Sequence, residues 1–135
     1  MRGVDLKGAR LRDASFQRAD LRDSDLGEAD AYRAKFISAD LRKARLDEAN
    51  LGEADFTRAN LAGASFQGAD LRRARFFRAN LRDADFTGAR VVGADLLNAD
   101  LSGATWTDGK HVCAEGSVGQ CQEEPRPERQ SHLWR

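Results

Sequence analysis

The chain has 135 residues, enough for one domain and too few for two of ordinary size. Its 22 basic residues balance 22 acidic residues, so the composition gives no general attraction to nucleic acid or to an anionic membrane. No run of residues approaches the roughly 18 apolar residues of a membrane-spanning helix, and the N-terminus lacks the apolar region of a signal peptide. We therefore expect a cytoplasmic protein, or a periplasmic or secreted one if a signal peptide precedes this N-terminus.

A five-residue repeat occupies residues 4–107. From Leu6 to Trp106 there are 21 positions spaced five residues apart, and all of them hold a large apolar residue except Ala31, which is small. Alanine stands two residues earlier at 19 of these 21 positions. A strict five-residue period rotates around an α-helix, and on a continuous strand it would alternate between the two faces. The chain must therefore turn after each pentad, so that both apolar columns return to one interior.

The large aromatic residues indicate how many pentads close one coil. They alternate with leucine at a period of ten residues, which requires an even number of sides, and four sides give a coil of 20 residues. Like residues then stack on like residues, as successive coils of a solenoid favour. The predicted core columns are Phe16, Phe36, Phe56 and Phe76; Leu21, Leu41, Leu61 and Leu81; and, in the later coils of a third side, Phe66, Phe86 and Trp106.

The units ADLRD (19–23), ADFTR (54–58) and ANLRD (79–83) resemble the A(D/N)LXX repeats of the pentapeptide-repeat family. This resemblance implies an all-β fold, a right-handed quadrilateral parallel β-helix of about five coils. The resemblance covers residues 4 to about 107, and we expect residues 1–107 to form a single domain. At a spacing of about 4.8 Å per coil, the rod would be about 25 Å long.

Polar columns run along the outside of this expected rod. The column of Asp20, Asp40, Asn60, Asn80 and Asp100 is expected to hydrogen-bond to the backbone at the turns. Two arginine stripes lie on neighbouring sides, one with Arg18, Arg58 and Arg78, the other with Arg22, Arg42 and Arg82. Acidic residues are interleaved with them, so we interpret the stripes as neutralised surface ladders. We expect no direct binding of nucleic acid and no membrane contact.

The repeat ends in a segment of different composition. Residues 108–122 begin with the turn signal Asp108-Gly109 and contain Cys113 and Cys121, which predicts a C-terminal cap loop. The two cysteines are interpreted as a disulfide or as two free thiols. A metal site with His111 would have only three ligands and lacks the paired spacing of structural zinc sites, so we expect no metal. The polar, proline-containing residues 123–135 predict a disordered tail.

The sequence offers no constellation for catalysis. The only histidines, His111 and His132, lie outside the repeat, and the glycines at the last pentad position are interpreted as turns. We therefore expect a non-enzyme without a cofactor: a bacterial scaffold or protein-interaction module. The family resemblance implies an alternative, a DNA-mimicking binder of type II topoisomerase (gyrase) that confers quinolone protection. The 17 acidic and 17 basic residues of the repeat weaken the electrostatic part of that alternative.

Five large apolar or aromatic residues stand at outward positions where most copies of the repeat are polar: Tyr32, Ile37, Phe77, Val92 and Leu97. The last four are the candidate patch residues. One interpretation is that β-branched and aromatic residues simply stack well on a sheet. The other is that Phe77, Leu97 and Val92 form an exposed apolar patch near one end of the rod. We expect a protein partner, or a second copy of the chain, to bind at this patch or at a rod end.

Overall fold

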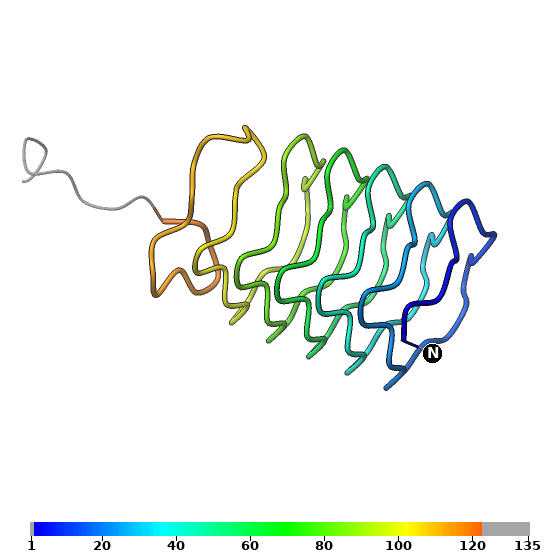
Figure 1. Cartoon of the computed structure of the whole chain (residues 1–135). Helices are drawn as coiled ribbons and strands as arrows, with labels where there is room; N and C mark the ends of the chain where they lie inside the picture. The colour runs from blue at the N-terminus through cyan, green and yellow to red at the C-terminus, as the bar shows by residue number, and fades with distance from the viewer. Residues whose placement is uncertain (1, 123–135) are drawn as a thin grey trace, which may run out of the picture.

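The structure, a computed structural model, describes residues 2–122 of the chain (Figure 1). This part of the chain has no helix and no extended strand; its regular structure consists of single-residue β-bridges. It accordingly has no helix that could span a membrane. The predicted disordered tail, 123–135, lies outside the described residues. The chain winds into a rod of stacked coils, with the N-terminus at one end and the last described residues folded against the other (Figure 1).

Each coil contains 20 residues. Parallel bridges join Asp5 to Asp25 and Asp25 to Arg45, and the same step recurs on every side of the coil as far as Thr105. Backbone hydrogen bonds run along the rod axis: the N–H of Leu6, for example, donates to the carbonyl of Asp25 at 2.7 Å. Because each coil satisfies the backbone groups of the next, the stack needs no long strand on any side.

A two-residue turn separates the sides of the coil. The second turn residue is left-handed in every pentad, with φ between 56° and 75° from Gly3 to Gly103. Glycine adopts this conformation freely, whereas a residue such as Arg78 is strained by about 1 kcal/mol. The same residue makes a hydrogen bond to the next coil, as the N–H of Asp13 does to the carbonyl of Tyr32 at 3.0 Å. Stacking thus offsets the turn strain.

The interior is filled by stacked columns. The rings of Phe36 and Phe56 are stacked with centroids 4.9 Å apart, and those of Phe56 and Phe76 are 5.0 Å apart. Phe66 meets Phe76 edge to face at 5.9 Å, which locks neighbouring columns together. The fully buried core residues include Phe36, Phe56, Phe66, Phe76, Phe86, Leu21, Leu41, Leu61 and Leu81. Phe16 and Trp106, near the two ends, are half-buried.

The Asp/Asn column fastens the turns as expected. The N–H of Ala62 donates to the Asn60 side chain at 3.2 Å, and the N–H of Ser102 donates to Asp100 at 3.1 Å. Each side chain therefore satisfies a turn donor that the neighbouring coils do not reach. These carboxylates and amides are structural.

The C-terminal segment folds back over the last coil. After the turn at Gly109, the chain runs antiparallel to the coil beneath it, with bridges from Thr105 to Val112 and from Asp100 to Val118. A further coil would have continued in parallel. The reversal at this point ends the repeat. The reversed segment covers two sides of the last coil, residues 99–106.

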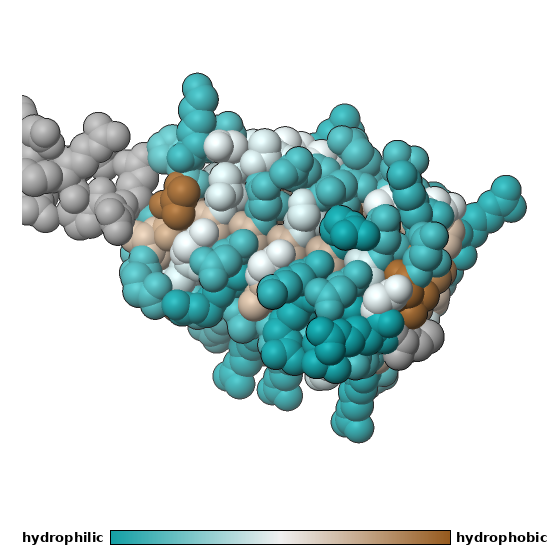
Figure 2. All heavy atoms as spheres, viewed as in Figure 1, coloured by the Kyte–Doolittle hydropathy of each residue, from teal (hydrophilic) through white to brown (hydrophobic). Residues whose placement is uncertain are grey.

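The N-terminal end is closed only in part. The N–H of Val4 donates to the hydroxyl of Ser24 at 3.1 Å. Ser24 is fully buried and stands where 19 of the 21 repeats have alanine, and its hydroxyl accepts this hydrogen bond from the first coil. The core residues Leu6 and Leu11 are half-buried there. Figure 2 shows a largely hydrophilic side of the rod with hydrophobic atoms gathered near its two ends.

Candidate interaction surfaces

The cysteines of the cap loop are joined to each other. Cys113 and Cys121 form a disulfide with their Cα atoms 4.8 Å apart. The ring of His111 contacts the carboxylate of Asp108. Within residues 2–122, no group of three or more His, Cys, Asp or Glu side chains is arranged to hold a metal ion. The loop therefore serves as a fastened cap.

Polar contacts tie this cap to the rod. The guanidinium of Arg82 donates to Asp100 at 3.0 Å and to Glu115 of the cap at 2.9 Å. Asp108 accepts hydrogen bonds from two backbone N–H groups of its own loop, those of Lys110 and His111, both at 2.9 Å. The backbone N–H of His111 and then that of Lys110 lower the pKa of Asp108 to about 2. A charged Asp108 thus stabilises the turn that starts the cap.

The other half of the last coil, residues 91–98, is open. In the coil before it, the N–H groups of Leu71 and Phe76 donate to carbonyls of the last coil at 2.8 and 2.7 Å. The equivalent N–H groups of the last coil have no acceptor among the described residues 2–122. They belong to Val91, Gly93, Leu96 and Asn98. This edge is a free end of the hydrogen-bond ladder.

Two of the four predicted patch residues lie at this open half. Val92 is 77% exposed and Leu97 is 58% exposed, the largest values among the large hydrophobic side chains of residues 2–122. Ile37 and Phe77 are half-buried, which is less exposed than the sequence suggested. The cause is local for Phe77, because the guanidinium carbon of Arg78 lies 5.2 Å from its ring centroid and shields one side.

All four patch residues border one side of the rod, which we call the Asp55 face. Its outward column is Ser15, Lys35, Asp55, Arg75 and Asp95, and a turn column lies along each edge. We number its rows along the rod: row 1 is residues 12–18, row 2 is 32–38, row 3 is 52–58, row 4 is 72–78 and row 5 is 92–98. Ile37, Phe77 and Leu97 lie in one edge column, and Val92 lies in the other.

The charges of the Asp55 face alternate from row to row. Row 2 is basic, row 3 is acidic, row 4 is basic and row 5 is acidic. The signs are those of the net charge: row 2 carries Arg33 and Lys35, row 3 carries Glu53 and Asp55 with Arg58 at its edge, row 4 carries Arg72, Arg73, Arg75 and Arg78, and row 5 carries Asp95. The charged residues of rows 2 to 4 nearest the outward column, from Arg33 to Arg75, line an open trough of about 500 Å³. We did not predict this alternation from the sequence, although the outward column shows it at a spacing of 20 residues: Lys35, Asp55, Arg75 and Asp95.

Part of this charge is unpaired. Arg33 contacts Glu53 at 3.3 Å. Lys35, Arg75 and Asp95 have no salt bridge within 4.0 Å among the described residues. Hydrogen bonds from backbone N–H groups hold Asp55 and Asp95 in place, at 2.9 and 3.0 Å. The face therefore carries fixed carboxylates beside free cations.

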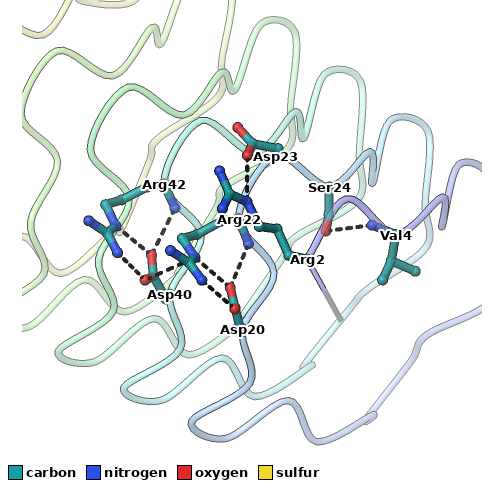
Figure 3. A network of polar contacts seen from close by, with 8 residues as sticks. All are labelled: Arg2, Val4, Asp20, Arg22, Asp23, Ser24, Asp40 and Arg42. Carbon is teal, nitrogen blue, oxygen red and sulfur yellow. Dashed lines mark hydrogen bonds and ion pairs between the residues drawn. The ribbon is translucent and has the colours of Figure 1, made fainter.

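The two arginine stripes also differ from each other. On one side, Arg22 and Arg42 each make paired contacts to an aspartate of the same pentad, Asp20 and Asp40, as Figure 3 shows. The guanidinium of Arg22 holds the pKa of Asp20 well below its usual value, and that of Arg42 lowers the pKa of Asp40. The neutralised ladder that we expected is present on this side.

The second stripe is not neutralised in this way. Arg18, Arg58 and Arg78 have no salt bridge within 4.0 Å among residues 2–122. They stand in the turns at the edge of the Asp55 face, one residue after the column of Ile37, Phe77 and Leu97. The balanced charge of the chain therefore hides an uneven distribution, with unpaired cations concentrated beside the apolar residues.

Known proteins share this fold. The chain matches the family model for pentapeptide repeats in eight copies, over residues 1–37, 39–76 and 79–105. No curated protein sequence matches it. Among solved structures, it is similar to Rfr23, a pentapeptide repeat protein from the cyanobacterium Cyanothece 51142, at 28% identity and a TM-score of 0.55. That similarity covers 78% of this chain and 89% of Rfr23.

Two other solved structures are longer than this chain. HetL from Nostoc sp. strain PCC 7120, a protein involved in heterocyst differentiation regulation, is 34% identical over 80% of this chain, with a TM-score of 0.43. QnrB1, a plasmid-mediated fluoroquinolone resistance protein, is 23% identical over 76% of this chain, with a TM-score of 0.59. The chain spans 62% of HetL and 50% of QnrB1, and its likeness to QnrB1 is one of fold.

Proposed function

We propose that this chain, which belongs to the pentapeptide-repeat family, is a right-handed quadrilateral β-helix that acts as a non-catalytic protein-interaction module. Proteins of this family are generally structural or interaction modules. The proposed binding surface is the Asp55 face with its apolar edge residues, Ile37, Phe77, Val92 and Leu97.

One observation carries this proposal: the most exposed apolar side chains occur together with unpaired charge. Val92 and Leu97 project at the open half of the last coil, and they border the face that carries Lys35, Arg75 and Asp95. A rod that needed only to be soluble would place polar residues at these positions, as most of its repeats do. Apolar contacts surrounded by charged groups are the usual composition of a protein-binding surface.

Site-specific photo-crosslinking in the native host tests the proposal. A photoreactive residue at position 77 lies on the proposed surface, and one at Gln67 lies on the opposite side of the rod as the matched control. We expect discrete crosslinked products from position 77 and none from position 67. Equal products from the two positions, or none from either, would contradict the proposed surface.

A second candidate function is binding to a type II topoisomerase through the opposite side of the rod. Asp25 and Asp85 face outward from that side, and Glu28, Asp47 and Glu48 occupy the turns along one of its edges. A row of carboxylates on a rod is what imitation of the DNA backbone requires. Here Arg45 stands between Asp25 and Asp85 and contacts Asp25 at 3.6 Å, so the row is interrupted and we rank this function second.

A gyrase supercoiling assay with a quinolone distinguishes the two functions. Topoisomerase binding predicts that the purified protein restores supercoiling in the presence of the drug, and that Asp47→Lys weakens this protection. An interaction module that binds through the Asp55 face predicts no protection even at a large molar excess.

A further inference from the structure

The charged rows of the Asp55 face are complementary to the same face of a second copy turned end to end. Row 2 is basic, row 3 acidic, row 4 basic and row 5 acidic. If two copies face each other antiparallel about a twofold axis between rows 3 and 4, then row 3 meets row 4 of the other copy. Row 2 likewise meets row 5. Each opposed pair of rows then has opposite net charge, with one like-charge contact at the edge, where Arg58 lies opposite Arg78.

We propose that two copies of this chain associate in this way, as an antiparallel, face-to-face dimer through the Asp55 face. The inference rests on the proposed function, because it names the partner of the same surface. In the central contacts, Asp55 lies opposite Arg75 of the second copy, and Lys35 lies opposite Asp95. Twofold symmetry makes each of these contacts twice.

Apolar contacts and charge both favour this register. With the axis between rows 3 and 4, row 5 lies against row 2, so Leu97 meets Ile37 and Val92 meets Tyr32. An axis between rows 2 and 3 would set row 1, with Arg12 and Arg18 beside Asp13, against the basic row 4, and it would leave row 5 uncovered. An axis through row 3 would bring the two basic rows, 2 and 4, together.

The shapes of the edge columns agree with the same register. Gly52 of row 3 is buried under the ring of Tyr32, since a Cβ at this position would lie 3.1 Å from a carbon of that ring. An open hollow of about 420 Å³ beside the ring is lined by Tyr32, Gly52 and Arg72 among others. The register places Arg72 of the second copy at this hollow. On the other edge, Phe77 lies over Thr57. The projecting residue of row 4 thus meets a smaller residue of row 3 on both edges.

A parallel arrangement of the two rods is excluded by the same charges. A twofold axis along the rod would place each row against itself, so that Lys35 and Arg75 of the central column would each face their own copies. Like charges at such distances repel. The net charge of the whole chain is zero at pH 7, so no long-range repulsion keeps antiparallel copies apart.

The contact is small. Four rows at about 4.8 Å per coil give a length of about 19 Å, which implies an interface below the roughly 1,600 Å² of a standard stable complex. We therefore expect weak association, with a dissociation constant in the micromolar range or above. Ion pairs between exposed groups contribute much of the binding free energy, so salt weakens the dimer.

Sedimentation velocity of the full chain, over a concentration series, tests the proposal. At about 20 mM salt we expect concentration-dependent dimerisation, and at about 0.5 M salt a monomer. A chain that stays monomeric at low salt up to millimolar concentration would overturn the proposal. If it is monomeric and position 77 still crosslinks to other proteins, the proposed function survives and the dimer does not.

Charge reversal identifies the surface and the register. Asp55→Lys should weaken the dimer at least about tenfold, because it places two like-charge pairs at the centre of the interface. The double variant Asp55→Lys/Arg75→Asp should restore the affinity in the proposed register, since each reversed residue again faces its opposite charge. Failure of the double variant to restore the dimer would overturn that register.

A matched control separates the interface from damage to the turn. Asp85 lies in the same Asp-Phe-Thr context as Asp55, accepts the same N–H bond from a threonine two residues later at 2.9 Å, and sits on the opposite side of the rod. Asp85→Lys should leave dimerisation unchanged. An equal loss of dimer in the two single variants would overturn the assignment to the Asp55 face.

A second variant does not depend on any turn hydrogen bond. Leu97→Ser removes an exposed side chain, so the rod keeps its fold, and it should weaken the dimer through loss of the contact with Ile37. An unchanged dissociation constant for this variant would contradict the proposed register.

Discussion

The last coil of the rod has two halves with the same repeat and different surroundings. In residues 99–106, Leu101 is fully buried and its N–H donates to Ser117 of the cap at 2.8 Å. In residues 91–98, Leu96 has the same position in its pentad, but it is half-buried and its N–H has no acceptor among the described residues. The repeat is the same in both halves, so the residues beyond it cause the difference.

This comparison teaches where a regular solenoid acquires an individual surface. Coils in the middle satisfy one another and differ only in their outward side chains. At the end, the cap covers two sides and leaves two open, and the open half carries the exposed residues Val92 and Leu97. The proposed function follows from this asymmetry.

The largest expected effect comes from truncating the same leucine in the two halves. Leu101→Ala removes a fully buried side chain and should lower the free energy of unfolding by about 2–5 kcal/mol. Leu96→Ala removes a partly hydrated one and should cost about 1 kcal/mol. Urea denaturation of the two variants measures the difference, and equal losses would show that the open half is covered in solution.

Reduction of the disulfide should make the covered half resemble the open one. The bond between Cys113 and Cys121 closes a loop with a sequence separation of 8, for which chain entropy gives about 2–3 kcal/mol of stabilisation. Denaturation with and without dithiothreitol measures this loss. Thiol alkylation in the native host shows whether the bond forms there, as an oxidising compartment would require.

Acid should loosen the cap by protonating Asp108. The folded state holds the pKa of this carboxyl at about 2, below its ordinary value of 3.8, so the folded chain binds fewer protons than the unfolded chain between these values. Its stabilising effect is therefore complete above about pH 4 and is lost as the pH falls toward 2. The NMR signal of the Trp106 indole should report this transition.

Asp108→Asn provides the matching control for the acid effect. Asparagine keeps a side-chain acceptor but carries no charge, so the variant should show a weaker cap at neutral pH and a smaller change on acidification. If the variant and the parent protein lose the cap over the same pH range, then other carboxylates cause the acid response.

The smallest expected effect on stability is that of Val92→Ser. Because this side chain is 77% exposed, its removal should change the free energy of unfolding by no more than about 0.5 kcal/mol. Loss of crosslinking from position 77 without loss of stability would assign Val92 to binding. A large destabilisation would instead show that Val92 packs against another part of the chain.

The sequence predicted the rod because its pattern is dense and repeats without interruption. Each pentad places alanine and a large apolar residue inward, so the coil length and the columns of Phe36, Phe56 and Phe76 follow from counting. The aspartates and asparagines of the turns were predictable for the same reason. Periodicity carries information that no single pentad has.

Other features depend on contacts that periodicity does not describe. The antiparallel course of the cap depends on a single turn at Gly109. Arg22 stands two residues after Asp20 and pairs with it, whereas Arg58 stands three residues after Asp55 and makes no salt bridge among the described residues. Phe77 is half-buried because Arg78 folds over its ring. Such features can be recognised only when the positions of the side chains are known.

Hydrogen exchange of the last coil tests the central claim most directly. At 0.5 M salt, where any dimer is dissociated, the amides of Leu101, Gly103 and Trp106 should exchange at least about tenfold more slowly than those of Val91, Gly93 and Leu96. The first three donate to the cap, and the second three have no acceptor among residues 2–122. Equal protection of the two sets would contradict the claim that the rod ends in one covered and one open half.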